Sequence, residues 1–365
     1  MNPVGSSPGR RPARRIVSPI AGLALLILAA SLAACGGGGK GGQSDQAPST
    51  PPAVDAAAAA SGHGLLLPRD QRLLVRNMED STEKVLKRAP PDLYYTYPRW
   101  SPDGKQIAYA LDLPYTGQPN QQWGSDIVLM AANGSGERTI VKRPAAGFKV
   151  EGLAWSADGA ALYAGVVETT IKDGRFVSQV FRVERIDLVG GARTPIVPEA
   201  TYPTAAADGS RIAYITYGEG DTPGGVWVAR PDGSDRKLLV PATGKFAAVY
   251  YPRFSPDSKT IAFSAATLGQ GAEPGPSVPS ARSWPRQPPV AAAHGFPMDV
   301  WAVSVDGGEP RRLTNFLEDE PYPAWSPDGG QLAIIATGGL YTVPAAGGDP
   351  KKIGLGGTLV QIDWR

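Results

Sequence analysis

The sequence has very few of the residues that carry metal and nucleophile chemistry. Of 365 residues one is cysteine, Cys35, and two are histidine, His63 and His294. A single cysteine excludes a disulfide within the chain and a cysteine metal cluster. Two histidines are too few for a histidine metal site, and neither lies in a recognisable catalytic context. Beyond its N-terminal stretch, the sequence also contains no Gly-x-Ser-x-Gly motif of the kind that holds a nucleophilic serine. We therefore expect no metal, no cofactor and no catalytic residue that the sequence alone can assign.

The net charge is also small. The chain has 36 Lys and Arg against 34 Asp and Glu. Four of the basic residues, Arg10, Arg11, Arg14 and Arg15, lie in an N-terminal stretch without acidic residues. Without them, 32 basic residues stand against 34 acidic ones, a net charge of −2. A surface this close to neutral gives no electrostatic reason to expect nucleic acid as a partner.

The four arginines begin an N-terminal targeting signal. An apolar run follows from Ile20 to Ala34. It is shorter than the roughly 20 apolar residues of a spanning helix and fits a signal peptide. Leu32 to Cys35 resembles a bacterial lipobox, in which the cysteine is acylated and the leader is removed. We predict a lipoprotein signal peptide over residues 1–34 and lipidation of Cys35, which attaches the protein to a membrane. The alternative is a cysteine inside an ordinary signal peptide.

A low-complexity segment separates this signal from the rest of the chain. Residues 36–62 are mainly glycine, alanine, proline and serine, a composition that cannot bury enough apolar area to fold. We predict a lipidated cysteine and flexible tether over residues 35–63. The folded domain is then expected over residues 64–365.

One short phrase recurs five times in the folded part. Its copies are YPRWSPDG, GLAWSADG, YPTAAADG, YPRFSPDS and YPAWSPDG, which begin at Tyr97, Gly152, Tyr202, Tyr251 and Tyr322. Each copy leads into an apolar, β-rich run. Pro presets φ at the second turn position, Asp bonds back to nearby amides and Gly accepts a left-handed conformation. The phrase therefore predicts strand, tight turn and strand, with the aspartates stabilising turns and the aromatic residues packing between sheets.

A second hairpin between consecutive copies completes a unit of four strands, which is one blade of a β-propeller. The two ends of the repeat region are complementary fragments: three strands from Leu65 to Arg88, and a lone inner strand from Leu359 to Arg365. We predict an all-β, six-bladed β-propeller with four-stranded blades. It is closed by pairing of the C-terminal strand with the N-terminal blade, which removes exposed sheet edges. A solenoid is the alternative.

The repeats resemble a known family. The pattern P-x-[WF]-S-P-D-G followed by I-A-[FY], with D-G-G-x-x-x-x-L-T in the second hairpin, is similar to the TolB-type, WD40-like propeller repeats, over roughly residues 64–365. The resemblance implies a propeller fold and a location in the bacterial envelope. The chain departs from TolB itself in lacking that protein's N-terminal α/β domain, which engages TolA. Lyases with similar repeats use histidine-rich metal sites, and this chain lacks those histidines.

The loops opposite the repeated turns are longer and less alike, and variable loops on a rigid scaffold are where binding is usually built. One of them is a proline-rich insertion, residues 269–297, for which a tolerated surface loop is the alternative. The candidate partner-binding residues on this face are Tyr94, Tyr95, Trp123, Tyr250, Tyr251, Trp284, Glu318, Asp319 and Glu320.

These features together predict a membrane-anchored envelope lipoprotein whose propeller binds or scaffolds a protein or peptide partner from the envelope. We expect it on the periplasmic or extracellular side, with the outer membrane as the expected membrane. The alternative is a propeller enzyme, a hydrolase or lyase, that acts on an envelope or extracellular glycan. A purely structural role in an envelope assembly is a third interpretation.

Overall fold

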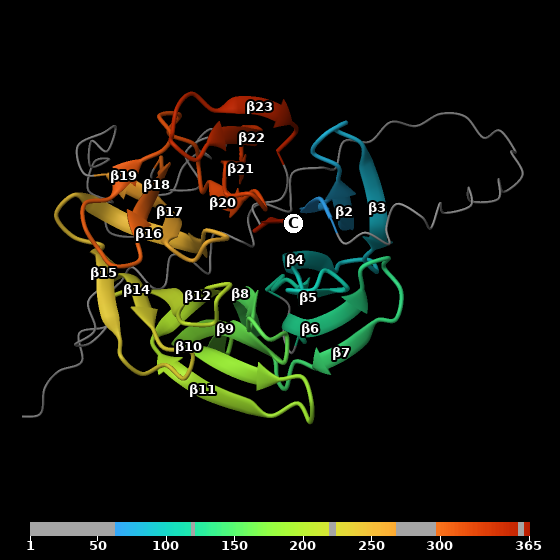
Figure 1. Cartoon of the computed structure of the whole chain (residues 1–365). Helices are drawn as coiled ribbons and strands as arrows, with labels where there is room; N and C mark the ends of the chain where they lie inside the picture. The colour runs from blue at the N-terminus through green and yellow to red at the C-terminus, as the bar shows by residue number, and fades with distance from the viewer. Residues whose placement is uncertain (1–62, 118–120, 219–223, 268–296, 357–360) are drawn as a thin grey trace, which may run out of the picture.

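The computed structural model describes residues 63–117, 121–218, 224–267, 297–356 and 361–365. Every regular element in these ranges is a β-strand, and the sheets surround a common centre in chain order (Figure 1). The predicted all-β propeller is confirmed. Within the described ranges no helix is long and apolar enough to cross a membrane. The predicted signal peptide, Cys35, the tether and the insertion with Trp284 lie outside the described residues.

Four of the sheets are separate blades with four strands each. The first consists of β24 (Asp363–Trp364), β1 (Leu65–Arg69), β2 (Arg72–Arg76) and β3 (Glu83–Arg88). The second consists of β12 (Ala200–Ala205), β13 (Ile212–Thr216), β14 (Gly225–Ala229) and β15 (Lys237–Pro241). The third consists of β16 (Phe246–Phe254), β17 (Thr260–Thr267), β18 (Asp299–Ser304) and β19 (Arg311–Arg312). The fourth consists of β20 (Tyr322–Trp325), β21 (Gln331–Ala336), β22 (Gly339–Pro344) and β23 (Lys351–Gly354).

The fifth sheet is continuous and has eight strands, so the prediction of six separate four-stranded blades is wrong. Its order is β11-β10-β9-β8-β6-β5-β4, with β7 paired to β6. Its strands are β4 (Tyr94–Trp100), β5 (Gln106–Leu113), β6 (Gly124–Ala131), β7 (Arg138–Val141), β8 (Phe148–Trp155), β9 (Ala161–Lys172), β10 (Arg175–Asp187) and β11 (Arg193–Pro198). The structure thus has four separate blades and one sheet of double width.

A single close approach joins the two halves of the eight-stranded sheet. Gly124 of β6 pairs with Phe148 of β8 in parallel orientation. Gly124 has φ +124, and a Cβ at this position would overlap the carbonyl oxygen of Phe148. Only glycine allows two backbones to meet this closely. The repeat pattern does not reveal this pairing, because it depends on one glycine outside the repeated phrase.

The ring is closed by the C-terminal strand. β24 pairs antiparallel with β1, through Leu65 with Trp364 and Leu66 with Asp363. The backbones of Gly64 and Arg365 exchange two further hydrogen bonds, of 2.5 and 3.2 Å. The predicted pairing of the last strand with the N-terminal blade is confirmed. It leaves no unpaired inner edge on β1.

The repeated aspartates stabilise turns, as predicted. The carboxylate of Asp103 accepts hydrogen bonds from the hydroxyl of Ser101 at 2.7 Å and from the amide of Lys105 at 3.0 Å. These bonds hold the pKa of the Asp103 carboxyl below its ordinary value. Equivalent bonds form at Asp158, Asp208, Asp257 and Asp328. We call the end of the propeller with these turns the turn face, and the opposite end the mouth face.

The repeated tryptophans join neighbouring inner strands. The indole N–H of Trp155 donates to the carbonyl of Arg99 at 3.1 Å, and that of Trp325 donates to the carbonyl of Arg253 at 3.0 Å. The indole N–H of Trp100 donates instead to the carbonyl of Gly64, just before β1 in the neighbouring blade, at 3.0 Å. All three side chains are buried. Each ring therefore fills the wedge between sheets while its polar atom has a partner, as buried indoles require.

Candidate functional site

The inner strands bring a row of tyrosines to the centre of the propeller. Tyr97, Tyr202 and Tyr251 each have positive φ, between 50 and 55°. Each lies at a register shift in the pairing with the next strand, which is a β-bulge. A bulky residue in the left-handed region costs about 1–3 kcal/mol, and such strain is concentrated at functional sites. The bulge re-aims the side chain, here toward the other inner strands.

The tyrosine rings form one contiguous group that we call the tyrosine cluster: Tyr97, Tyr202, Tyr251 and Tyr322. The ring centroids are 6.3 Å apart for Tyr97 and Tyr202, 4.9 Å for Tyr202 and Tyr251, and 3.9 Å for Tyr251 and Tyr322. All four side chains are buried. They come from β4, β12, β16 and β20, which face the centre in Figure 1. The cluster therefore fills the axis of the propeller.

Gly152 replaces the tyrosine in the fifth of these inner strands, β8. It has φ +101, and a Cβ there would lie 2.8 Å from the Cα of Tyr202. A side chain at this position would collide with the neighbouring strand. Its absence leaves the space across which Tyr97 and Tyr202 meet, although their strands are not adjacent. The departure from the repeated phrase is thus part of the geometry of the centre.

Two glutamates lie beside the tyrosine cluster on its mouth side. Glu151 precedes Gly152, and its Oε2 lies 3.4 Å from the hydroxyl of Tyr217, which donates to it. Glu320 precedes β20, and its Oε2 lies 3.4 Å from the hydroxyl of Tyr322. Both side chains are half-buried. Burial raises the pKa of both carboxyls, and burial together with the charge of Asp319 raises the pKa of Glu320 to about 7.

A third carboxyl and one ammonium complete this group. Asp112 of β5 is 7% exposed, and burial raises its pKa. The ammonium of Lys149 in β8 lowers the pKa values of Asp112, Glu151 and Glu320 and therefore acts on all three. The rings of Tyr217 and Tyr250 stand next to each other, 6.4 Å between centroids. We call Asp112, Lys149, Glu151, Tyr217, Tyr250 and Glu320 the axial site.

The axis is filled with paired polar groups nearer the turn face. Arg99 is 3% exposed and donates to the carbonyls of Leu153 at 2.7 Å and Ile362 at 3.2 Å. It also donates to the side chain of Gln361. Arg253 forms an ion pair with Asp363. These bonds tie the C-terminal segment to the inner strands β4 and β16, and β4 to β8, and close the axis below the tyrosines, so a ligand would reach the axial site from the mouth face.

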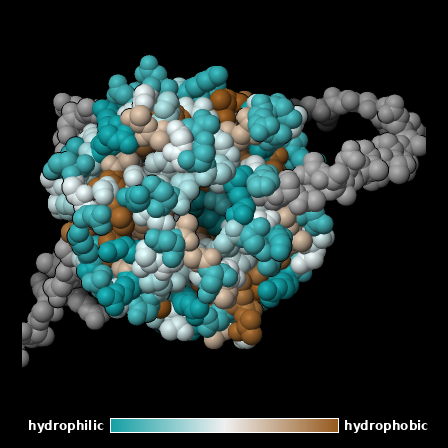
Figure 2. All heavy atoms as spheres, viewed as in Figure 1, coloured by the Kyte–Doolittle hydropathy of each residue, from teal (hydrophilic) through white to brown (hydrophobic). Residues whose placement is uncertain are grey.

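Figure 2 shows that one face of the molecule is hollowed near its middle, and that hydrophilic residues line the hollow. Apolar residues appear mainly between the blades.

The structure brings three of the predicted binding residues together at the centre. Tyr250, Tyr251 and Glu320 all belong to the axial site or the tyrosine cluster, and Asp319 is half-buried beside Glu320. Tyr250 and Tyr251 have centroids 5.5 Å apart. Tyr251 itself is buried and forms part of the floor of the site, so Tyr250 is the tyrosine of this pair that a ligand reaches.

The other predicted residues lie away from the centre. Tyr95 is buried and packs edge-to-face against Tyr109, 5.1 Å between centroids. Trp123 is buried against Tyr115. Glu318 accepts hydrogen bonds from the hydroxyl of Tyr341 at 2.7 Å and the amide of Gly338 at 3.0 Å. Tyr94 is half-buried at the start of β4. These four residues do not form part of one site with Glu320.

Sequence reasoning missed Asp112, Lys149, Glu151, Tyr202, Tyr217 and Tyr322. A signal was present for some of them. The tyrosine that opens the repeated phrase recurs in four of five copies, and the fifth has Gly152 after a glutamate. Turn chemistry explains the SPDG part of the phrase but not this tyrosine. The recurrence therefore had a separate cause, which is the axial cluster.

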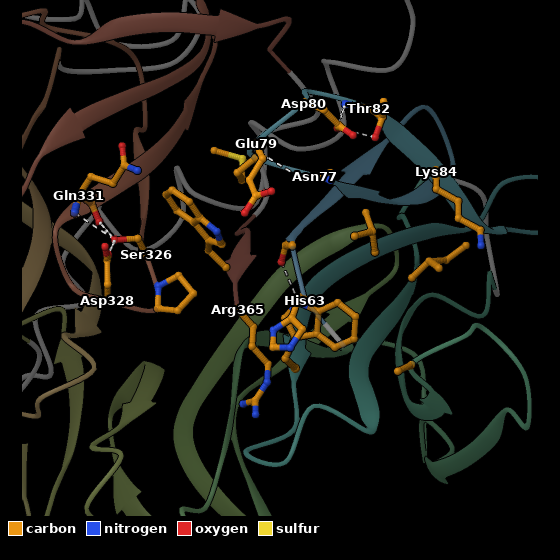
Figure 3. Close-up of a pocket in the computed structure, with 18 residues that line it drawn as sticks. His63, Asn77, Glu79, Asp80, Thr82, Lys84, Ser326, Asp328, Gln331 and Arg365 are labelled. Carbon is orange, nitrogen blue, oxygen red and sulfur yellow. Dashed lines mark hydrogen bonds between the residues drawn. The ribbon is translucent and has the colours of Figure 1, made fainter. Parts of the chain in front are cut away.

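A groove at the turn face of the propeller is less suited to binding than the axial site. It has a volume of about 680 Å³ and lies between the turn after β2 and the turn after β20, near both chain ends of the domain (Figure 3). Two of its three side-chain carboxylates, Asp80 and Asp328, are already used in turns. Asp80 accepts from the amide and hydroxyl of Thr82, and Asp328 accepts from Ser326 and Gly330. No group of three or more His, Cys, Asp or Glu among the described residues is arranged to hold a metal ion.

The comparisons with known proteins show the fold. No family model and no curated protein matches the sequence. Among solved structures, TolB from Acinetobacter baumannii is similar, with a TM-score of 0.52 at 15% identity, over 83% of this chain and 66% of that one. A chain of the nidogen/laminin complex is similar with a TM-score of 0.55 at 13% identity, over 82% of this chain and 97% of that one.

The class of protein follows from these matches and the strand order: the chain has a TolB-like β-propeller fold. It spans just under two thirds of the length of the TolB chain it matches. An oligogalacturonate lyase in complex with manganese is a more distant match, with a TM-score of 0.42 at 13% identity, over 80% of this chain and 86% of that one. At these identities the similarity establishes the fold and leaves the function to the site.

Proposed function

We propose that this protein is a lipid-anchored binding module of the bacterial envelope, which holds a protein or peptide partner over the axial site on its mouth face. The observation that carries the proposal is the group of half-buried carboxyls and tyrosines at the axis. Propeller ligands meet a rigid scaffold there, because every inner strand contributes to the centre. The filled axis below the tyrosines makes the mouth face the side of approach.

A second feature of the mouth face favours a macromolecular partner. The hairpin of β9 and β10 has 12 and 13 residues per strand, longer than the other strands of its sheet. Its far end lies opposite the Ser156–Gly159 turn, hence at the mouth face. Phe176, Val177 and Val180 near that end are 44, 56 and 52% exposed. Exposed apolar side chains on a projecting hairpin offer apolar surface for a protein partner to cover.

The location rests on the N-terminal sequence and on the repeats. The lipobox-like segment ending at Cys35 supports a lipid anchor, and the TolB-like fold supports the envelope as compartment. A tether of 27 residues, 36–62, would separate the propeller from the membrane by roughly 25–30 Å if it behaves as a flexible coil. The mouth face is then free to meet a partner in the surrounding space.

Site-specific photo-cross-linking in intact cells tests the proposal. A photoreactive amino acid replaces Tyr250 in one strain and Lys105 in another. Lys105 lies on the turn face, where 82% of its side chain is exposed. We expect a discrete cross-linked product from position 250 and none of the same mass from position 105. Equal products from both positions, or none from position 250, would refute a partner at the mouth.

The second candidate function is a propeller enzyme that acts on an envelope glycan. It is favoured by one observation, the pKa of Glu320 near 7, which suits a general acid at neutral pH. Hydrolysis or elimination would be assayed on purified envelope glycan fragments with the parent and Glu320→Gln. Product formation by the parent and its loss in the variant would support this function over the binding module.

A further inference from the structure

The axial site carries more negative charge than its own residues neutralise. Asp112, Glu151 and Glu320 supply three carboxyls, and Lys149 supplies one ammonium that acts on all of them. Above the raised pKa of Glu320, about 7, where all four groups are ionised, their net charge is −2. The hydrogen bonds to the glutamates come from neutral tyrosine hydroxyls at 3.4 Å, beyond the usual range for such bonds. The guanidinium of Arg143 also lowers the pKa of Asp112, but it lies 3.7 Å from the carboxylate of Asp126, so compensation from within the chain is partial.

An unpartnered buried atom points to the same conclusion independently of the charge count. The Oδ1 of Asp112 accepts no hydrogen bond from the described residues, and the Oγ1 of Thr96 close to it also lacks a partner. Both side chains are 7% exposed. Hydrogen bonding from the hydroxyls of Ser125 and Thr96 lowers the pKa of the Asp112 carboxyl, while its Oδ1 has no partner of its own among the described residues. Buried polar atoms without partners are rare, and each calls for a donor.

The aromatic residues around these carboxyls suit a cation with an apolar stem. The rings of Tyr217 and Tyr250 are half-buried at the rim, and the tyrosine cluster forms the floor. A cation is attracted to the face of a tyrosine ring. The methylenes of a lysine or arginine side chain pack on apolar surface while its charged end seeks polar groups. The rim and the carboxyls thus match the two parts of one side chain.

We propose that the axial site takes the lysine or arginine side chain of an extended segment of the partner protein, with its positive group among Asp112, Glu151 and Glu320. The inference rests on the proposed function and adds the chemistry of the partner. An acidic segment would bring like charges together and is selected against. A bound cation donates several hydrogen bonds at once, including one to the open Oδ1 of Asp112.

A displayed library of random 12-residue peptides provides the probe. The library is selected against the immobilised full-length chain in detergent, and bound peptides are sequenced. We expect lysine and arginine to be enriched at least about threefold over the unselected library. A binder with one dominant lysine is then synthesised with that lysine free or Nε-acetylated. Acetylation keeps the stem and removes the charge, and we expect it to weaken binding about tenfold or more, as loss of a charge-assisted hydrogen bond does.

A charge-matched pair of variants separates the site from the overall charge. The first double variant, Glu151→Gln with Glu320→Gln, removes two carboxylates at the axis. Glu309→Gln with Asp349→Asn removes two exposed carboxylates in turns at the turn face. The first variant should lose the enrichment of cationic peptides, and the second should retain it. Circular dichroism and thermal unfolding of both variants establish that each is folded.

The outcomes distinguish the two proposals. Binders that depend on Tyr250 but show no enrichment of lysine and arginine, or that tolerate acetylation, overturn the cation specificity and leave the mouth as a binding face. Cationic binders that persist in the Glu151 and Glu320 variant also overturn it. A selection that yields no binder competing at the mouth face overturns the binding function together with the inference.

Discussion

The hydroxyls of Tyr251 and Tyr322 lie 3.1 Å apart, and their ring centroids are separated by 3.9 Å. The hydroxyl of Tyr322 also lies 3.4 Å from Glu320. One phenol therefore links the buried tyrosine cluster to a carboxyl of the axial site. Because a hydroxyl has a single proton, Tyr322 donates either to Tyr251 or to Glu320 at any moment. Protonation of Glu320 is thereby coupled to the arrangement of the tyrosines.

Replacing Tyr322 by Phe tests this link. The variant keeps the ring and removes the hydroxyl that lowers the pKa of Glu320. We expect the pKa of Glu320 to rise above the parent value of about 7. NMR titration of ¹³C-labelled glutamate side chains measures it directly. Tyr214→Phe is the control, because that buried hydroxyl has no hydrogen-bond partner among the described residues. An unchanged titration of Glu320 in Tyr322→Phe would contradict the coupling.

The backbone contact within the eight-stranded sheet predicts that two glycine substitutions reduce the free energy of unfolding by unequal amounts. Gly124→Ala introduces a Cβ against the carbonyl of Phe148 and should destabilise the fold by about 2–4 kcal/mol, since backbone must move. Gly117 also has positive φ, +81, but a Cβ there meets nothing within 4 Å. Gly117→Ala should cost only about 1 kcal/mol. Urea unfolding compares them, and equal losses would show that the close approach does not matter.

The contacts of the C-terminal strand predict that the stability of the fold depends strongly on the carboxylate of Asp363. Asp363 pairs with Arg253 and accepts a hydrogen bond from the amide of Trp100 at 2.9 Å. Asp363→Ala leaves a mostly buried guanidinium and an amide unpaired, so we expect a loss of about 3–5 kcal/mol. Asp349→Ala, at an exposed position, should cost less than about 0.5 kcal/mol. If Asp363→Ala unfolds in urea at the same concentration as the parent, the C-terminal strand is not held by this residue.

Local chemistry explains which parts of the fold could be predicted. The turns around Asp103 and the wedge packing of Trp155 follow from segments of fewer than ten residues, in which the deciding contacts are close in sequence. The closing of the ring by Trp364 followed from complementary fragments. The number of separate blades could not be predicted, because the Gly124 contact joins β6 to β8 through one backbone position outside the repeat.

The axial site was only partly predictable for a related reason. Asp112, Glu151 and Glu320 come from three strands or strand starts separated by 39 and 169 residues in sequence. No short pattern contains two of them. Glu151 lies near the start of an inner strand and Glu320 just before one, whereas Asp112 lies at the end of β5, so their meeting depends on how the hairpins are arranged around the axis and on the bulges that turn Tyr97, Tyr202 and Tyr251 inward. Tyr250 and Glu320 were found because they lie next to repeated phrases.

The lipid anchor is a prediction of the sequence alone. If Cys35 is acylated, intact-mass analysis of the protein from membranes should find an N-terminus at Cys35 that carries acyl chains. Cys35→Ser should abolish acylation and leave the leader uncleaved. Deleting part of the tether while keeping Cys35 is the control, since it should not affect processing. An unmodified Cys35 in the mature protein would make the chain a secreted protein without an anchor.

The raised pKa of Glu320 also predicts how stability depends on pH. The ordinary value of 4.5 applies to the unfolded chain, whereas the folded value is about 7 because of burial and the charges of Asp319 and Glu151, partly offset by Tyr322 and Lys149. Between these two pH values the folded state retains a proton that the unfolded state has lost. Stability from this group therefore falls as pH rises through the window from about 4.5 to 7.

Glu320→Gln removes that fall, because glutamine does not titrate. We expect the parent to lose on the order of 2–3 kcal/mol relative to the variant between pH 4.5 and pH 8, at most, since part of the Glu320 side chain contacts water. Urea unfolding of both proteins across this range gives the difference, and Glu309→Gln, at an exposed turn, should follow the parent. A bound cationic peptide favours the ionised carboxylate, so its affinity for the parent should rise from pH 6 to pH 8, in the direction opposite to the stability. Stability curves of the parent and Glu320→Gln that stay parallel would mean that Glu320 ionises normally, and the pH-dependent affinity would then have to come from Asp112 or Glu151.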